Sequence, residues 1–344
     1  MSGLLDIDAV LEKFRRFLEE RRNLGKPLGP RGPVITSEAS LSKYYQVARR
    51  FLINMAPGYR GLDYLPDDAA REYLSILRRR CRPRTVLVAY SALKNLYACM
   101  GWPWSIELRQ ILPEGIEKLS DAAFLKREEI QKVLEYAEEK ARTGDFIDIR
   151  NVVIAYLIFY GLRPADVIRL RVGNVSFRKV KEEDTGEEYE ACVIQYTPCK
   201  KGRPTTKVLS RRASIWLQRW LGFLESIFNQ DELPFAPLIP SFRAAAPPNV
   251  KSRERRLKVR MFKALSYRQL HNVMRELIIG ALGNQGYGRA APYCIRRGIV
   301  SYLLESRRAS AEDLCKWFGW RSPSMPLIYD KRRTEEVAER FINI

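Results

Sequence analysis

Histidine is almost absent from this chain of 344 residues, which contains only His271. The six cysteines include no C-x-x-C pair, so little could complete a zinc site, and we expect structural thiols with no bound metal and no cofactor. The longest apolar run, Val152 to Leu162, is too short to span a bilayer, and acidic residues stand where a signal peptide would be basic. These absences predict an intracellular, cytoplasmic protein.

Negative charge is also scarce. Lysine and arginine together number 60 against 40 aspartates and glutamates, which gives a net charge of +20. Residues 1–120 carry 20 basic and 13 acidic side chains, and residues 121–344 carry 40 and 27. The charge indicates a polyanionic partner, and its even spread favours a clamp around DNA over a globular body with one basic tail.

The first hundred residues show helical spacing of apolar residues. The expected helices span about residues 6–23, 40–55, 67–80 and 83–100. This pattern predicts an all-helical bundle with arginines on its outer faces.

The periodicity is lost within about residues 104–122, where proline recurs. We therefore assign residues 1–112 to a helical DNA-binding domain, 113–122 to a linker, and 123–344 to a second domain.

A Gly-Leu-Arg turn follows the apolar run of the second domain. Arg163 stands directly before Pro164, and proline is favoured at the first position of a helix. A charge held against an apolar helix has to be paired or functional. Asp166 is close enough to orient Arg163, and an interhelical salt bridge is the structural alternative.

The segment from Tyr189 to Leu209 alternates and is rich in β-branched residues on both sides of Lys-Lys-Gly-Arg-Pro. It predicts a β-hairpin with a basic tip. Further on, residues 242–275 contain ten basic residues and one acid, and predict a loop followed by a helix from about Ser266. This cluster is suited to tracking phosphates without reading sequence.

Several residues suited to handling one phosphate occur between Ala291 and Tyr329. Arg296 and Arg297 begin an apolar helical run, Trp320 follows a glycine, and Tyr329 follows a proline-containing turn. Arginine offers phosphate permanently charged, bidentate donors, and tyrosine is able to form a covalent intermediate. The structural alternative is a basic surface helix followed by a buried aromatic residue.

This stretch resembles the C-terminal signature of the tyrosine recombinase family, which includes phage integrases and Xer-like proteins. In that family a His-x-x-Arg pair opens a helix, and the nucleophilic tyrosine comes nine positions after a His or Trp. Trp320 and Tyr329 have that spacing, Arg296 matches the second arginine, and GLRPAD matches the Gly-Leu-Arg-x-x-Glu/Asp box. One position departs, because Tyr293 stands where the family has histidine, and His271 lies too far upstream to replace it by a register slip.

The resemblance implies a mainly α fold with a small antiparallel β-sheet, arranged as a two-domain, C-shaped clamp. It implies a site-specific DNA recombinase that works through a 3′-phosphotyrosyl intermediate without metal or ATP. Tyr329 would be the nucleophile, Arg163, Arg296 and Trp320 would bind the phosphate, and Lys200 would protonate the leaving oxygen. Lys201 is the alternative to Lys200, and a hairpin tip that only touches phosphate is a further alternative.

The expected partners are double-stranded DNA and further copies of this chain, as a dimer on each site and a tetrameric synapse. No membrane is involved, and the protein would be associated with the nucleoid. The residues expected to contact DNA are Lys201, Arg203, Arg297, Arg253, Arg255, Arg256, Lys258, Arg82 and Arg84. In the tail, residues 330–344, an apolar stripe would dock on a neighbouring protomer or fold back on its own domain.

Two other functions stay open at this point. Tyr293 in place of histidine would suit a DNA-binding relative with impaired catalysis. A type IB topoisomerase would use the same chemistry on a single strand.

Overall fold

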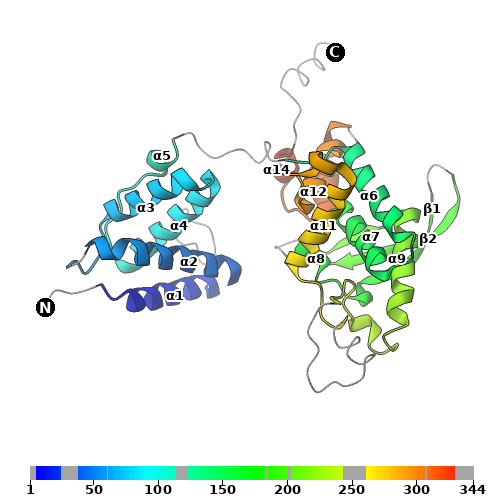
Figure 1. Ribbon diagram of the computed structural model, residues 1–344, viewed down its shortest axis with the longest axis horizontal. Helices are drawn as coiled ribbons and strands as arrows, with labels where there is room; N and C mark the ends of the chain where they lie inside the picture. The colour runs from blue at the N-terminus through cyan, green and yellow to red at the C-terminus, as the bar shows by residue number, and fades with distance from the viewer. Residues whose placement is uncertain are drawn as a thin grey trace, which may run out of the picture. The chain divides into compact units, whose positions relative to one another are not determined.

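The structure, a computed structural model, describes residues 5–24, 38–59, 61–113, 123–182, 185–199, 203–242, 261–306 and 308–329. The chain divides into two compact units, Met1–Lys118 and Leu119–Ile344 (Figure 1). Residues 114–122 of the predicted linker lie outside the described residues. None of the described helices is long and apolar enough to cross a bilayer.

All the regular elements described in the first unit are helices. Its elements are α1 (Ile7–Asn23), α2 (Glu38–Met55), the 3₁₀-helix η1 (Ala56–Tyr59), α3 (Asp67–Arg80), α4 (Pro83–Met100) and α5 (Leu108–Ile111). The four helices predicted from apolar spacing are confirmed to within two residues at each end. Helix α1 begins after Asp6 because the Asp6 side chain accepts a hydrogen bond from the Ala9 amide at 3.0 Å, which satisfies one free helical N–H group.

The core of the first unit extends past α4 into the range where periodicity is lost. The ring of Tyr97 makes edge contacts with Trp102 and Trp104, at centroid distances of 5.2 and 5.1 Å. Ile106 and Ile111 are buried in the same cluster. Residues 104–112 therefore pack on the bundle, although helical periodicity is lost there.

The second unit combines helices with one small sheet. Its helical elements are α6 (Arg127–Ala141), α7 (Phe146–Phe159), α8 (Pro164–Val167), η3 (Val172–Asn174), α9 (Arg211–Glu225), η4 (Leu233–Phe235), α11 (Tyr267–Leu282), η5 (Gly283–Gly286), α12 (Pro292–Glu305), α13 (Ala311–Phe318) and α14 (Ser324–Leu327). The strands β1 (Val175–Lys181), β2 (Glu188–Tyr196) and β3 (Thr205–Val208) form an antiparallel sheet in that order. The predicted hairpin is β2–β3, in which Val193 pairs with Val208. Strand β1 was not predicted.

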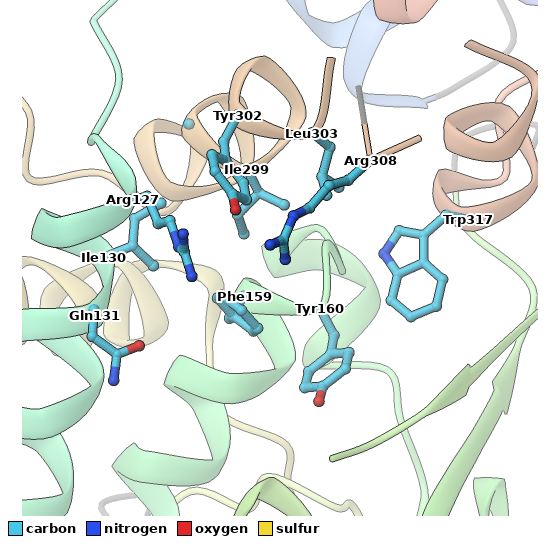
Figure 2. A pocket seen from close by; sticks show the side chains of 11 residues that line it. Arg127, Ile130, Gln131, Phe159, Tyr160, Ile299, Tyr302, Leu303, Arg308 and Trp317 are labelled. Carbon is cyan, nitrogen blue, oxygen red and sulfur yellow. The ribbon is translucent and has the colours of Figure 1, made fainter. Parts of the chain in front are cut away.

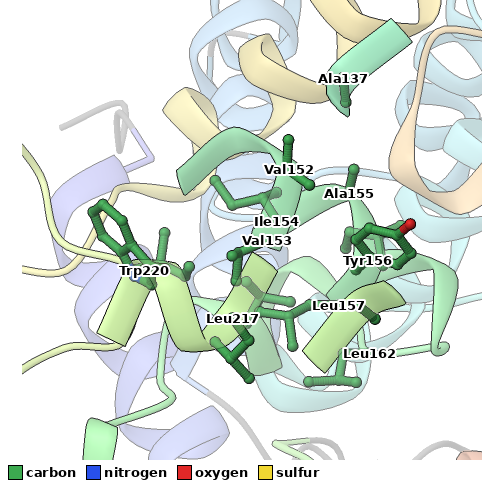
Figure 3. Close-up of a cluster of buried hydrophobic side chains, with 14 of the residues drawn as sticks. Ala137, Val152, Val153, Ile154, Ala155, Tyr156, Leu157, Leu162, Leu217 and Trp220 are labelled. Atoms are coloured by element: carbon green, nitrogen blue, oxygen red, sulfur yellow. The ribbon is translucent and has the colours of Figure 1, made fainter. Parts of the chain in front are cut away.

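Helix α7 lies at the centre of the second unit, between α6 and α9 (Figure 1). It is apolar on nearly all sides, so every face has to be covered. Its residues Val152 to Leu157 pack against Leu217 and Trp220 of α9 (Figure 3). The helix begins where the Asp145 side chain accepts a hydrogen bond from the Ile147 amide at 2.7 Å.

Two glycines let α12 and α13 approach the rest of this unit closely. A Cβ atom at Gly298 of α12 would lie 1.8 Å from the carbonyl oxygen of Leu125. Gly161, at the end of α7, has a φ of +85°, and a Cβ there would lie 2.1 Å from the ring of Phe318. Side chains at these positions would push α12 and α13 away from Arg163, which follows Gly161 by two residues.

Candidate active site

Arg163 is held at the start of α8, where the sequence placed it. It is the residue before the helix, and Pro164 is the first helical residue. Helix α8 is only four residues long, so it serves mainly to fix this corner. The Arg163 amide donates to Asp166 Oδ2 at 3.2 Å, and its guanidinium Nη1 lies 3.7 Å from the same oxygen. Asp166 therefore lies close enough to orient Arg163, and that role stays a prediction.

Asp166 also connects this corner to the β2–β3 hairpin. Its carboxylate is 2% exposed, and Oδ1 accepts a hydrogen bond from the Cys199 amide at 2.8 Å. The Cys199 thiol in turn contacts the carbonyl oxygen of Ala165 at 3.4 Å. One buried carboxylate therefore fixes both the first arginine and the residue that precedes Lys200.

Arg296 is buried in α12 against aromatic rings. The residue is 5% exposed, and its guanidinium carbon lies 4.4 Å from the ring centroid of Phe318 and 5.3 Å from that of Trp320. Cation–π contacts of this kind stabilise a guanidinium but leave its N–H groups without acceptors. The buried Nη2 atom has no hydrogen-bond partner among the described residues.

The electrostatics show which groups surround Arg296. Burial, and then the positive charge of Arg163, lower the pKa of Arg296 to about 10, so it stays charged at neutral pH. Nearby Tyr196, Tyr329 and Asp166 raise the pKa of Arg296 and so partly oppose this shift. Two arginines of like charge therefore lie near each other and near Tyr329, an arrangement that favours an anion between them.

Trp320 and Tyr329 stack on one another beside Arg296. Their ring centroids are 5.8 Å apart with an interplanar angle of 10°, and Trp320 also stacks on Phe318 at 4.7 Å. Trp320 follows Gly319, whose left-handed φ of +65° ends α13. The backbone oxygen of Tyr329 accepts a hydrogen bond from the buried hydroxyl of Ser301 at 2.9 Å, which fastens it to α12.

Tyr293, at the position of the family's histidine, lies in the first turn of α12 and is partly exposed. Burial, and then the nearby Tyr293, raise the pKa of Tyr267 at the start of α11. The ring of Tyr267 lies 4.6 Å from that of His271, centroid to centroid. The only histidine thus contacts Tyr267, which lies near Tyr293, although 21 residues of the sequence lie between His271 and Tyr293.

Sequence reasoning missed two residues of this neighbourhood. Tyr196, the last residue of β2, has a raised pKa because of burial and then Asp166, and the charges of Arg296 and Arg163 oppose this shift. Lys207 of β3 is fully buried and donates a hydrogen bond to the carbonyl oxygen of Trp317. Neither residue belongs to a motif, and only tertiary packing brings them to the site.

Several predicted contacts lie outside the described residues. These are Lys200, Lys201, Arg253, Arg255, Arg256 and Lys258. Arg82, Arg84 and Arg203 are exposed, as a DNA contact requires. Arg297 donates to the carbonyl oxygen of Ala123 at 3.1 Å, so it supports the segment before α6. The DNA contacts of all these residues stay predictions.

A separate pocket of about 320 Å³ lies between α6, α7, α12 and α13. Figure 2 shows the guanidinium groups of Arg127 and Arg308 beside it, with Tyr302 near both. The two guanidinium carbons lie 4.8 and 5.9 Å from the centroid of the Tyr302 ring. Phe159, Ile299 and Leu303 contribute apolar surface, and no acidic residue is among the described residues that line the pocket.

No known family model matches this sequence, and no curated protein matches it. Solved structures do match. A XerH site-specific recombinase bound to difH substrate is similar with a TM-score of 0.67, at 14% identity over 98% of this chain and 98% of that chain. The Tn1549 transposon integrase in complex with transposon right end DNA has a TM-score of 0.57, at 12% identity over 97% and 98%.

A lambda integrase tetramer bound to a Holliday junction is also similar, with a TM-score of 0.53 at 13% identity over 95% of this chain and 78% of that chain. All three proteins are tyrosine recombinases or integrases. The chain therefore has the fold of the tyrosine recombinases, and the predicted fold class is confirmed: mainly helical with a small antiparallel sheet.

Proposed function

We propose that this chain is a site-specific recombinase that cleaves and rejoins DNA strands through a phosphotyrosyl intermediate. The observation that carries the proposal is the environment of Arg296. Its buried guanidinium has an Nη2 with no hydrogen-bond partner in the described part of the chain. It has aromatic rings for neighbours and lies near Arg163 and Tyr329. Burying a charge without a counterion costs several kcal/mol. A bound phosphodiester would offset that cost, since its oxygens match the planar fork of arginine.

The residue types suggest how cleavage of a DNA strand would proceed. Arg163 and Arg296 would bind the nonbridging oxygens and stabilise the charge that develops at phosphorus. Trp320 would add its indole N–H. The Tyr329 oxygen would form a bond to phosphorus while the bond from phosphorus to the 5′ oxygen breaks. The step moves one proton from Tyr329 to the 5′ oxygen, which we expect Lys200 to protonate. Asp166 would keep Arg163 in place.

The phosphotyrosyl bond would retain the energy of the phosphodiester. A second strand could therefore be joined without ATP, which is what recombination requires. No step in this scheme needs a metal, because the arginines supply the positive charge.

Strand exchange also requires several protomers on DNA. We propose that residues 334–344 of one protomer dock on its neighbour, with Val337, Phe341 and Ile342 as the apolar contact. The pocket beside Arg127 and Arg308 suits this segment, since Glu335, Glu336 and Glu339 would face a lining without described acids.

Changing Tyr329 to phenylalanine tests the proposed chemistry. The Tyr329→Phe variant should form no covalent adduct with a nicked suicide DNA substrate, while its affinity for that DNA changes less than about twofold. The exposed Tyr287→Phe is the control and should form adduct normally. An adduct in the Tyr329→Phe variant would place the nucleophile elsewhere, with Tyr293 and Tyr302 the next to test. Adduct formation should also survive excess EDTA.

A further inference from the structure

Lys207 is a buried lysine that the proposed chemistry does not use. It is 0% exposed, and its Nζ lies 3.9 Å from the ring centroid of Trp317 and 5.5 Å from that of Phe318. Lysine is almost never fully buried without a charged partner. Burial, and then the charge of Arg296, lower the pKa of Lys207 to about 6. At neutral pH its side chain is therefore mostly an uncharged amine.

A neutral amine can still donate a hydrogen bond, and the acceptor of Lys207 is a backbone oxygen at the end of a helix. Nζ donates to the backbone oxygen of Trp317, in the last turn of α13. The last four carbonyl groups of a helix have no partner within the helix. The amides of Gly319 and Trp320 both donate to Cys315, one turn earlier, so Lys207 supplies a donor to a different carbonyl of this turn.

Strand β3 contacts the end of α13 at a second point. A Cβ atom at Gly319 would lie 2.8 Å from the Thr205 hydroxyl, so Gly319 lies directly against the Thr205 side chain. Lys207 and Thr205 lie on the same face of β3, and both are buried. This face therefore holds the segment from Trp317 to Gly319 from one side.

The segment held by β3 carries the aromatic rings of the candidate active site. Phe318 and Trp320 stack with each other and face Arg296, and Trp320 stacks on Tyr329. A shift of the last turn of α13 would move these rings together. Methionine would fill the space of Lys207 without the penalty of burying an amine, so the amine has to contribute something that methionine cannot.

We propose that Lys207 is a positioning residue for strand cleavage, whose amine fastens the last turn of α13 to β3 and thereby aligns Trp320, Arg296 and Tyr329. This inference rests on the function proposed above. Lys207 does not act as the proton donor, because its amine is fully covered and its hydrogen bond points to Trp317.

The test compares three variants: Lys207→Met, Lys207→Gln and, as the control, Lys179→Met at an exposed position of the same sheet. At saturating DNA, Lys207→Met should form adduct about 100-fold more slowly, with a Kd within about threefold of the wild-type value. The Gln side chain retains an N–H donor, so Lys207→Gln should form adduct about tenfold faster than Lys207→Met. The control should match the wild type.

Each variant is also given DNA with a 5′-bridging phosphorothiolate, whose sulfur leaves without needing a proton. Lys207→Met should stay equally slow on this substrate, whereas Lys200→Ala should recover. Recovery of Lys207→Met would make Lys207 the proton donor and overturn the positioning role. An unchanged rate on ordinary DNA would also overturn it.

A measurement on the free protein separates this inference from the proposed function. Amide hydrogen exchange at Gly319 and Trp320 should be at least about tenfold faster in Lys207→Met than in the wild type and unchanged in Lys179→Met. If the wild type forms no adduct but exchange accelerates as expected, the fastening role holds and the proposed function fails. Unchanged exchange would refute the fastening role whatever the activity.

Discussion

Two buried arginines of the second unit are alike in burial and in aromatic contact, but they differ in their hydrogen bonds. Arg150 is 6% exposed and Arg296 is 5% exposed. The guanidinium carbon of Arg150 lies 5.2 Å from the ring centroid of Phe242, and that of Arg296 lies 4.4 Å from Phe318. Arg150 donates to Asn151 Oδ1 at 2.9 Å and to the carbonyl oxygen of Pro240 at 3.4 Å, whereas Nη2 of Arg296 has no described partner.

This difference separates a structural arginine from one that is available to a ligand. The bond from Arg150 to Pro240 connects α7 to the segment after η4, so it contributes to the fold. Nη2 of Arg296 is buried without such a bond among the described residues, and another arginine lies nearby. A buried polar group that is left unpaired in a native structure needs an explanation, and the proposed contact with a DNA phosphate provides one here.

Replacing each arginine by methionine should give the largest of the expected effects and separate their two roles. Arg296→Met should slow adduct formation by about 10³-fold, close to 4 kcal/mol of barrier, because it removes charge stabilisation at phosphorus. Its stability to denaturant should not fall and should rise by up to about 4 kcal/mol, because the variant loses few hydrogen bonds and no longer buries an unpaired charge.

The matched Arg150→Met variant should show the opposite pattern. It removes the bonds from Arg150 to Asn151 and to the buried oxygen of Pro240, and should lower the free energy of unfolding by about 1–3 kcal/mol. Adduct formation by the fraction that remains folded should be nearly normal. A similar loss of stability in both variants, with similar activity, would remove the distinction between the two arginines.

The next effect concerns Lys207, the third buried basic side chain among the described residues, and the dependence of stability on pH. Its pKa falls from the ordinary 10.5 to about 6 in the folded protein, so between these values the unfolded chain binds more protons than the folded one. Stability should therefore rise with pH across this window, with a slope from this residue of up to about 1.4 kcal/mol per pH unit.

Urea unfolding at several pH values between 6 and 10, in wild type and in Lys207→Met, measures this contribution. The variant should show a smaller rise. Parallel curves for the two proteins would mean that the Lys207 amine is not desolvated in the folded state.

The smallest effect is expected at Arg308, an arginine that is exposed and faces the pocket next to Tyr302. Arg308→Glu should repel the acidic tail and weaken cooperative binding to paired sites by about tenfold, while single-site affinity changes less than about threefold. Deleting residues 334–344 should have the same effect. Normal cooperativity in both proteins, measured by gel shift on single and paired sites, would exclude this pocket as the docking site.

The local sequence was sufficient to predict the parts of the site whose residues are close together in the chain. Gly161, Arg163 and Pro164 predicted the corner before α8, and Asp166 was expected to orient Arg163 because it is only three residues away. Trp320 and Tyr329, which are nine residues apart in the sequence, also stack on one another.

The contacts between distant segments could not be predicted. In β3 the buried face carries Thr205 and Lys207, whereas Val208 is only partly buried, so hydrophobic alternation assigns Lys207 to the solvent side. Strand β1 was missed because most of its residues are exposed and so carry little apolar pattern. The path from His271 through Tyr267 to Tyr293 depends on how α11 and α12 lie in space, which spacing along the chain does not specify.

In the proposed mechanism, the N–H groups of Arg296 bind the charged scissile phosphate. The most direct test uses suicide DNA in which a methylphosphonate replaces that phosphate, which removes the negative charge, and compares wild type with Arg296→Met. Our account predicts that the defect of about 10³-fold on ordinary DNA shrinks to less than about tenfold on the neutral DNA, because little charge is left to stabilise. An equal defect on both substrates would contradict it, and would mean that Arg296 serves the fold as Arg150 does.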